Sequence, residues 1–365
     1  MVCHSHAPDA VVSLLGPFAD GGWGVTTFFG ISGFLITRNL FQEIRATGRI
    51  DARAFWTKRL AKLVPSLALL LGALWLLGQF RSTGCRPPAF FIAALFGTAL
   101  LPSHSCWYLA HTWSLSVEEC FYAGCVGFLV LCARWPRLLK FAFLILGVSP
   151  ILRVLNQLRR TSDTRILLGH YHAIPVIEFF DIFVILGFAA YAFERWGASL
   201  GTGAVDDKIG RRVGAVVRRT PLSVAIGVEV AGEFVMERTG NLVAIALVPT
   251  VHAIVLAILA LKLVLGVERG IVARLLELRP LKYLGLISYS LYLTNPTFLT
   301  YGAPDILGLG LQVFPLSWAA AIGLSSANYH WFEEPMRRRI RRLLLPRRRT
   351  PASTECPVTN SPAAS

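Results

Sequence analysis

Long apolar stretches alternate with short, basic polar gaps along most of the chain. A helix that crosses a bilayer needs about 20 apolar residues, whereas runs of about 10–14 are more often re-entrant or packed inside protein. The pattern therefore predicts an all-α fold, a polytopic transmembrane helical bundle of about 8–10 spans. Two stretches, 89–101 and 221–232, are too short or too weakly apolar to assign. The predicted spans are 24–40, 64–80, 113–133, 138–152, 174–193, 242–267, 281–301 and 306–331.

Composition supports a membrane protein. Hydrophobic residues make up 54% of the 365 residues and charged residues 16%, which lies outside the usual range of soluble domains. We expect one membrane domain over residues 1–338, followed by a basic and then disordered cytoplasmic tail over residues 339–365. The net charge of +15 comes from Arg and Lys in the gaps and the tail, without interleaved aromatic residues. Bilayer orientation explains these charges better than binding to nucleic acid.

Positive charge gathers in four segments, 45–62, 195–219, 269–282 and 337–349. Because cytoplasmic loops carry an excess of Lys and Arg, we expect all four on the cytoplasmic side, provided that 89–101 does not cross. This predicts a multi-pass protein of the cytoplasmic membrane with a cytoplasmic C-terminus. One gap does not fit, and its basic residues would either be misplaced by the span assignment or bind an anionic acceptor. They are Arg153, Arg159, Arg160 and Arg165.

The cysteines have no metal-binding spacing, and no metal site is predicted. Cys85 and Cys106 fall in two polar gaps that could share one membrane face, so a disulfide between them is possible. Cys120, Cys125 and Cys132 lie in an apolar segment and are most simply buried small hydrophobes.

The segment HTWSLSVEECFYAG places two adjacent glutamates inside an apolar stretch. A charged side chain at the bilayer centre costs about 2.5–3.5 kcal/mol, so such residues normally face the bundle interior and mark function. Helical spacing stacks His111, Ser114, Glu118 and Tyr122 on one face. Glu119 lies about 100° round the helix from that stripe and ranks second. Alternatively, both glutamates sit at the membrane interface, where the helix macrodipole favours carboxylates.

Two further groups of side chains could carry chemistry. His4 and His6 precede the first clear span, and a histidine can accept a proton from an attacking hydroxyl. They could equally belong to a solvated terminus. Lys58, Arg59 and Lys62 lie within five residues before Pro65 and suit a phosphate clamp, although orientation in the bilayer also explains them.

Five segments in order resemble the integral-membrane acyltransferases of the acyltransferase 3 type, which acylate sugars of surface polysaccharides, lipooligosaccharides and related acceptors. The segments are GVTTFFGISGFLITRNL, FWTKRLAKLVP, TWSLSVEECFY, LKYLGLISYSLYLTNP and NYHWFEEPMRR. The resemblance covers most of the chain, from about Cys3 to Arg338. Each motif alone is weak, but five in sequence order are specific.

The resemblance implies transfer of an acyl group, commonly acetyl, from acyl-CoA on the cytoplasmic side to a hydroxyl of a carbohydrate or small-molecule acceptor on the other side. It points to His6, ahead of His4, as the base, and to Glu118 as the membrane carboxylate. Lys58, Arg59 and Lys62 would hold the CoA phosphates, with acyl-CoA as a co-substrate and no permanently bound cofactor. Positions implied to line the substrate cavity are Ser32, Trp113, Ser114, Tyr122, Tyr289 and Asn295.

The sequence departs from the family pattern at two places. The family has a full helix before the histidine, and this chain has five residues before His6. Asn295 stands where the family shows a histidine, and an amide cannot carry the proton. Two other interpretations therefore stay open: an inactive truncated relative, and a transporter or flippase of a lipid-linked sugar or acyl group with Glu118 as its coupling carboxylate. Against the transporter, the sequence shows no paired halves and no P-loop.

Overall fold

The computed structural model describes residues 21–80, 83–101, 106–134, 139–161, 175–200, 207–267, 270–299 and 315–345. Within these ranges the secondary structure is helical, without a β-strand. The helices are α2 Gly21–Thr47, α3 Ala52–Phe80, α4 Pro87–Ala94, α5 Trp107–Ala110, α6 Trp113–Arg134, α7 Leu139–Thr161, α9 Pro175–Glu178, α10 Phe180–Leu200, α11 Lys208–Arg219, α12 Leu222–Thr239, α13 Leu242–Val264, α14 Ile271–Leu276, α15 Arg279–Leu286, α16 Ser288–Leu299, α17 Leu316–Asn328 and α18 Glu334–Leu344, with the π-helix Tyr329–Glu333 before α18.

Three helical segments are long and apolar enough to cross a membrane: Ala52–Phe80, Val176–Gly197 and Leu242–Val264. The predicted all-α membrane fold is confirmed, whereas the number of spans stays a prediction. The helix α4 has 8 residues, which rise about 12 Å and cannot cross a bilayer. The segment 89–101 therefore does not span as one helix, which is the condition that the predicted topology needs.

Several predicted boundaries are wrong. The helix α3 begins at Ala52, twelve residues before the predicted span, so its basic residues lie on the first turns of a helix instead of in a loop. The stretch 221–232, which the pattern does not assign, starts at the N-cap Pro221 and lies in α12, an 18-residue helix. The predicted span 281–301 is divided at Ile287 between α15 and α16. The first of these is a short amphipathic helix without buried residues.

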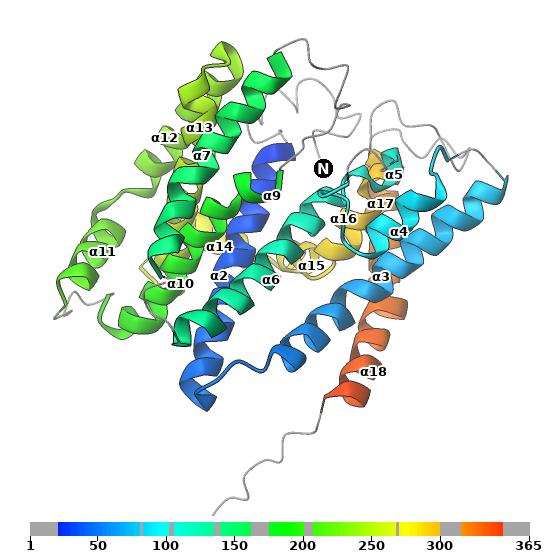
Figure 1. Cartoon of the computed structure of the whole chain (residues 1–365), viewed down its shortest axis with the longest axis horizontal. Helices are drawn as coiled ribbons and strands as arrows, with labels where there is room; N and C mark the ends of the chain where they lie inside the picture. The colour runs from blue at the N-terminus through cyan, green and yellow to red at the C-terminus, as the bar shows by residue number, and fades with distance from the viewer. Residues whose placement is uncertain are drawn as a thin grey trace, which may run out of the picture.

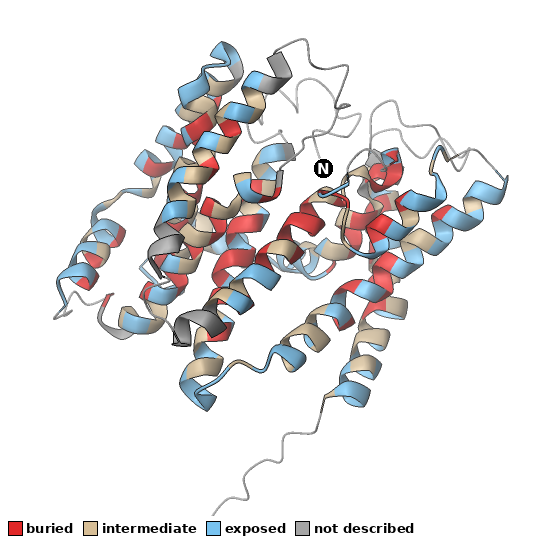
Figure 2. Cartoon of the chain, viewed as in Figure 1, coloured by how far each residue is buried: buried red, intermediate tan, exposed pale blue. Residues whose placement is uncertain are grey.

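The helices form two groups with α6 between them (Figure 1). In the first, α10 packs against α2, α7 and α13, and α12 covers α13. In the second, α3 packs against α16, α18 and the π-helix, and α17 packs against α16. Figure 2 shows the buried residues gathered where the helices face one another. The helix α6 is therefore positioned to receive side chains from both groups.

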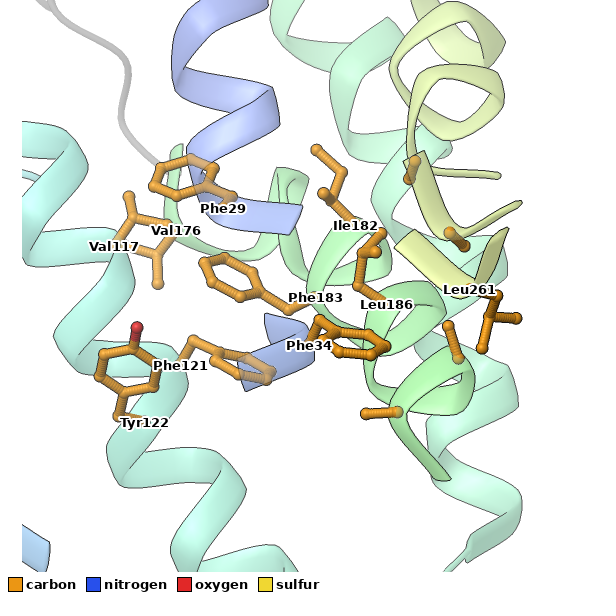
Figure 3. Close-up of a cluster of buried hydrophobic side chains, with 14 of the residues drawn as sticks. Phe29, Phe34, Val117, Phe121, Tyr122, Val176, Ile182, Phe183, Leu186 and Leu261 are labelled. Carbon is orange, nitrogen blue, oxygen red and sulfur yellow. The ribbon is translucent and has the colours of Figure 1, made fainter. Parts of the chain in front are cut away.

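An aromatic core joins α2, α6 and α10 (Figure 3). The rings of Phe121 and Phe183 stack with centroids 4.1 Å apart, and Phe29 lies 5.0 Å from Phe183. A Cβ atom on Gly33 would lie 2.9 Å from the backbone of Phe183. Glycine at this position therefore lets α2 approach α10 closely, which fixes the position of the neighbouring residue Ser32.

One end of the bundle contains a disulfide, and the opposite end contains basic residues of α18. A disulfide joins Cys85 and Cys106 beside α4 and α5, so the predicted possibility is confirmed. Figure 1 shows the α2–α3 junction and the end of α18 at the opposite end of the bundle. The first basic residues of the predicted tail lie on α18 and are helical, whereas residues 346–365 lie outside the described residues.

Candidate active site

Both glutamates of α6 are buried inside the bundle. Glu118 and Glu119 lie in the second turn of α6 and are 1% and 7% exposed. A position at the membrane interface, which would leave the carboxylates in contact with headgroups and water, does not agree with this burial. Charges buried this deeply require partners, because desolvation of an unpaired carboxylate is costly.

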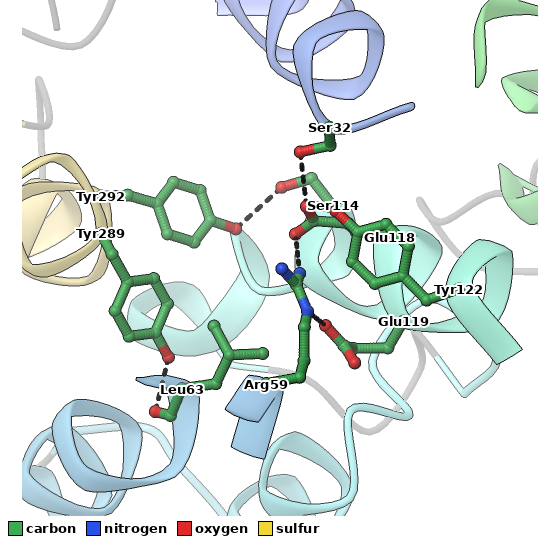
Figure 4. Close-up of polar contacts among 9 residues, drawn as sticks. All are labelled: Ser32, Arg59, Leu63, Ser114, Glu118, Glu119, Tyr122, Tyr289 and Tyr292. Atoms are coloured by element: carbon green, nitrogen blue, oxygen red, sulfur yellow. Dashed lines mark hydrogen bonds and ion pairs between the residues drawn. The ribbon is translucent and has the colours of Figure 1, made fainter. Parts of the chain in front are cut away.

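Arg59 of α3 pairs with both carboxylates (Figure 4). Its Nη2 lies 2.7 Å from Oε2 of Glu118, and its Nε donates to Oε1 of Glu119 at 2.7 Å. The guanidinium carbon also lies 4.0 Å from the centroid of the Tyr122 ring, a cation–π contact. Glu119 has no polar companion on its own helix, and its partner comes from another helix.

Two hydroxyls complete the coordination of Glu118. Ser32 of α2 donates to Oε1 at 2.6 Å, and Tyr122, one turn along α6, donates to the same oxygen. The predicted stripe of Ser114, Glu118 and Tyr122 on one face of α6 is confirmed. His111 lies in the turn before α6 and not on that helix. The carboxylate is thus held by side chains from three helices.

The helix α16 contributes two tyrosines to the site, which contact α3 and the start of α6. Tyr292 contacts the hydroxyl of Ser114 at 2.8 Å and donates to the carbonyl of His111. Tyr289 donates to the carbonyl of Leu63 at 2.8 Å, which ties α16 to α3. These tyrosines belong to the SYxxY segment, and Figure 4 shows both rings facing the space around Arg59.

The remaining predicted site residues divide into three groups. Lys58 and Lys62 are exposed residues of α3, and Lys62, one turn after Arg59, still interacts electrostatically with Glu118. Trp113 packs on Phe29 and Phe179 in the aromatic core. His4, His6 and the side chain of Asn295 lie outside the described residues.

The segment NYHWFEEPMRR forms a second polar cluster, in which its side chains contact serines of α3 and α16. Glu333, 1% exposed at the end of the π-helix, accepts from Ser66 at 3.1 Å and from Ser290 at 2.7 Å. Asn328 donates to both serines, at 3.1 and 2.9 Å. A π-helix inside a longer helix frequently marks a functional site, because the extra residue re-aims the side chains around it. Here it turns Glu333 toward α3 and α16, near the tyrosines of the site.

Arg153, the first basic residue of the gap that did not fit the predicted topology, lies inside the bundle. It is buried on α7, where its Nη2 pairs with Asp181 of α10 and its Nη1 donates to the hydroxyl of Thr250 at 2.9 Å and to the carbonyl of Ala246 at 2.8 Å. This arginine is therefore neither an outward loop residue nor a free anion-binding group. The side chains of Arg159 and Arg160, and the whole of Arg165, lie outside the described residues.

The arrangement at α6 offers a guanidinium held between two carboxylates, with hydroxyls around it, inside an apolar bundle. A guanidinium of this kind can bind a phosphate or polarise a carbonyl oxygen once a ligand displaces one carboxylate. Among the residues that the structure describes, no three His, Cys, Asp or Glu side chains gather where they could hold a metal ion.

Comparison with known proteins extends these observations. Residues 1–327 match the acyltransferase 3 family, described as an acyltransferase domain. A Staphylococcus aureus (strain COL) protein named "Putative O-acetyltransferase" is 36% identical over 151 residues, which cover 36% of this chain and 24% of that protein. The Peptidoglycan O-acetyltransferase OatA of Listeria monocytogenes is 26% identical over 174 residues, 42% of this chain and 27% of that protein.

The aligned parts thus span about a quarter of the length of these curated relatives. No solved structure matches the chain. The family match, by contrast, covers residues 1–327, which end in α17, and includes Ser32, Arg59, Glu118 and both tyrosines of α16. Because that match covers most of the sequence and all of the ion-paired site, the chain belongs to the acyltransferase 3 family of integral-membrane acyltransferases.

Proposed function

We propose that the protein is a membrane O-acyltransferase that moves an acyl group, acetyl in the simplest case, from acyl-CoA to a hydroxyl of a carbohydrate or related acceptor. The observation that carries the proposal is the buried contact of Arg59 with Glu118 and Glu119. It lies among the motifs shared with a family of acyltransferases. An ionised cluster inside a membrane bundle is a functional site by default.

Acyl-CoA is proposed as donor because of the charges along α3. Lys58 and Lys62 are exposed, and Arg59 lies between them in sequence with its guanidinium in the bundle. Exposed ammonium groups suit the phosphates of CoA, while the buried guanidinium suits the thioester oxygen or the innermost phosphate. The donor would then enter from the basic end of α3, with the acyl group directed toward Glu118.

In this mechanism Glu118 positions Arg59. Its Oε1 already accepts from Ser32 and Tyr122, and its Oε2 faces the guanidinium. A carboxylate with these partners holds the cation in place and is not available as a general base for the acceptor hydroxyl. His6 stays our candidate for that base.

The acceptor class is proposed from the relatives. One carries peptidoglycan O-acetyltransferase in its name, so carbohydrate hydroxyls of a cell wall are the first acceptors to test. With the basic ends of α3 and α18 in the cytoplasm, the protein would lie in the cytoplasmic membrane with a cytoplasmic C-terminus, and the acceptor would be met on the opposite side.

The test is CoA release by purified protein in detergent, supplied with acetyl-CoA and a cell-wall carbohydrate extract. We expect Glu118→Gln to lower the rate by about 100-fold or more, because Arg59 loses the charge that orients it. The matched control is Arg53→Gln, an exposed charge at the start of the same helix, which is expected to keep the wild-type rate. Folding of each variant is checked by its elution profile and melting temperature.

Two results would contradict the proposal. Wild-type release in Glu118→Gln would remove this site from the reaction. Movement of a lipid-linked acceptor across vesicles without consumption of acyl-CoA would support a transporter in its place.

A further inference from the structure

Another polar cluster lies between α2, α12 and α13, on side chains that the Arg59 site does not use. His252 is at the middle of α13 and is 1% exposed, and Glu229 is at the middle of α12 and is 4% exposed. Trp23 and Thr27 reach them from the first two turns of α2. Titratable groups at mid-helix positions of a membrane bundle normally have a functional role.

The contacts of this cluster assign its protons. Trp23 Nε1 donates to Oε1 of Glu229 at 2.6 Å, and an indole nitrogen is a donor and never an acceptor. His252 Nδ1 contacts the same oxygen, and with Glu229 as a carboxylate, which can only accept, we assign the ring hydrogen to Nδ1. The neutral ring then has its lone pair on Nε2, which lies 3.1 Å from Oγ1 of Thr27. The Trp23 ring packs edge-on against the imidazole, with centroids 5.0 Å apart, and holds its plane.

The result is a hydroxyl in contact with an imidazole that is in contact with a carboxylate, the set of contacts that activates a serine or threonine nucleophile. We propose that Thr27 is an acyl-accepting nucleophile, with His252 as its base and Glu229 as the group that orients His252. The ligand class is an activated acyl group, a thioester or ester. The inference deepens the proposed acyl transfer and depends on it for the identity of the donor.

The steps balance as an acyl relay. Oγ1 of Thr27 attacks the thioester carbonyl while its proton passes to Nε2 of His252, the C–S bond breaks, and the leaving thiolate takes that proton. The acceptor hydroxyl then gives its proton to Nε2, so that in this relay His252 takes the place of His6 as the base, and attacks the threonine ester. The ester C–O bond breaks, and the proton returns to Oγ1. Glu229 stays ionised and stabilises the imidazolium in both halves.

The position of Thr27 fits a relay between two membrane faces. Thr27 precedes Ser32 by five residues, about 7.5 Å along α2, toward the end away from the basic α2–α3 junction. It is half-buried, whereas His252 is fully buried. The Thr27 hydroxyl donates to the carbonyl of Trp23 at 3.0 Å inside its own helix, so its one hydrogen has to turn to Nε2 of His252 before attack. A clamp that merely fastens α2 to α13 is therefore the competing explanation that the test must separate.

The test uses the full chain in detergent without acceptor, so that an acyl-enzyme accumulates. One sample receives acetyl-CoA and a second receives p-nitrophenyl acetate, an activated ester that needs no CoA site. Peptide mass spectrometry locates the acetyl group. The variants are Thr27→Val, Thr27→Ser and His252→Gln, and the matched control is Thr26→Val, whose hydroxyl donates to the carbonyl of Gly22.

We expect an acetyl group on the peptide of Thr27, absent in Thr27→Val, retained in Thr27→Ser and the control, and formed about 100-fold more slowly in His252→Gln. Labelling by p-nitrophenyl acetate but not by acetyl-CoA would support the nucleophile and contradict the proposed donor. Absence of the label with both reagents, or equal labelling in Thr27→Val, would overturn the inference and leave the clamp.

Discussion

The buried pair of Arg153 and Asp181 gives a prediction about stability that does not depend on activity. The two side chains are 5% and 0% exposed, and they join α7 to α10 and, through Thr250, to α13. Arg153→Met leaves the carboxylate with the Thr250 hydroxyl at 2.5 Å but without a cation. Loss of one partner of a buried ion pair costs about 3–5 kcal/mol, whereas replacement of both by apolar residues is often neutral.

We therefore expect Arg153→Met to lower the free energy of unfolding by about 3–5 kcal/mol, and the double variant with Asp181→Leu to recover most of that loss. The assay is reversible unfolding in mixed micelles with increasing SDS, followed by circular dichroism. The control is Arg45→Met, because the Arg45 side chain is 67% exposed and pairs with Glu194 at the surface. That change is expected to cost less than about 1 kcal/mol.

A single variant as stable as the control, or a double variant as unstable as the single one, would refute the reasoning. The first result would mean that water or another group already compensates Asp181. The second would mean that the packing of the arginine stem, and not its charge, holds α7 in place.

Three further predictions follow from single contacts. Glu119→Gln is expected to slow acyl transfer by about tenfold, less than the change at its neighbour, because Arg59 keeps its other carboxylate; CoA release measures this. Gly33→Ala is expected to destabilise by about 1–3 kcal/mol in the micelle assay, since its Cβ would lie 2.9 Å from the backbone of α10. Cys85→Ser is expected to cost about 3 kcal/mol in the same assay, because the disulfide to Cys106 closes a loop with a sequence separation of 21.

Helical periodicity predicted one half of the site and missed the other for a definite reason. The spacing of Ser114, Glu118 and Tyr122 is a property of α6 alone, so the sequence shows it directly. The partner of Glu119 comes from α3, and nothing in the local pattern of α6 indicates which face α3 will cover. A weak signal existed, because Arg59 lies five residues before the predicted span 64–80, and a helix that extends back by about one and a half turns includes it.

Hydropathy placed the helices well and their ends poorly. It ended the fourth span at 152, one residue before Arg153, because a charge lowers the local average. The helix α7 continues to Thr161, since Asp181 and Thr250 satisfy the arginine inside the bundle. A hydropathy scale counts each residue alone and therefore cannot include a partner that folding supplies from another helix.

In the described part of the chain, Arg153 and Arg59 each pair with acidic side chains inside the bundle, and the two clusters differ in their charge balance. Arg153 and Asp181 form a neutral pair, whose donors also reach a hydroxyl and a backbone carbonyl. Arg59 is the one cation in ion pairs with Glu118 and Glu119 in the described part of the chain, so these three side chains have a formal charge of −1 when both acids are ionised, with Lys62 interacting with Glu118 at longer range. An apolar bundle gains nothing in stability from such a surplus, because a buried charge without a partner is costly. The surplus is explained if the cluster must bind or release a proton, or receive the polarised acyl donor, during each turnover. We therefore propose the Arg59 cluster as the first place to test acyl transfer, and the Arg153 pair as the first place to test stability.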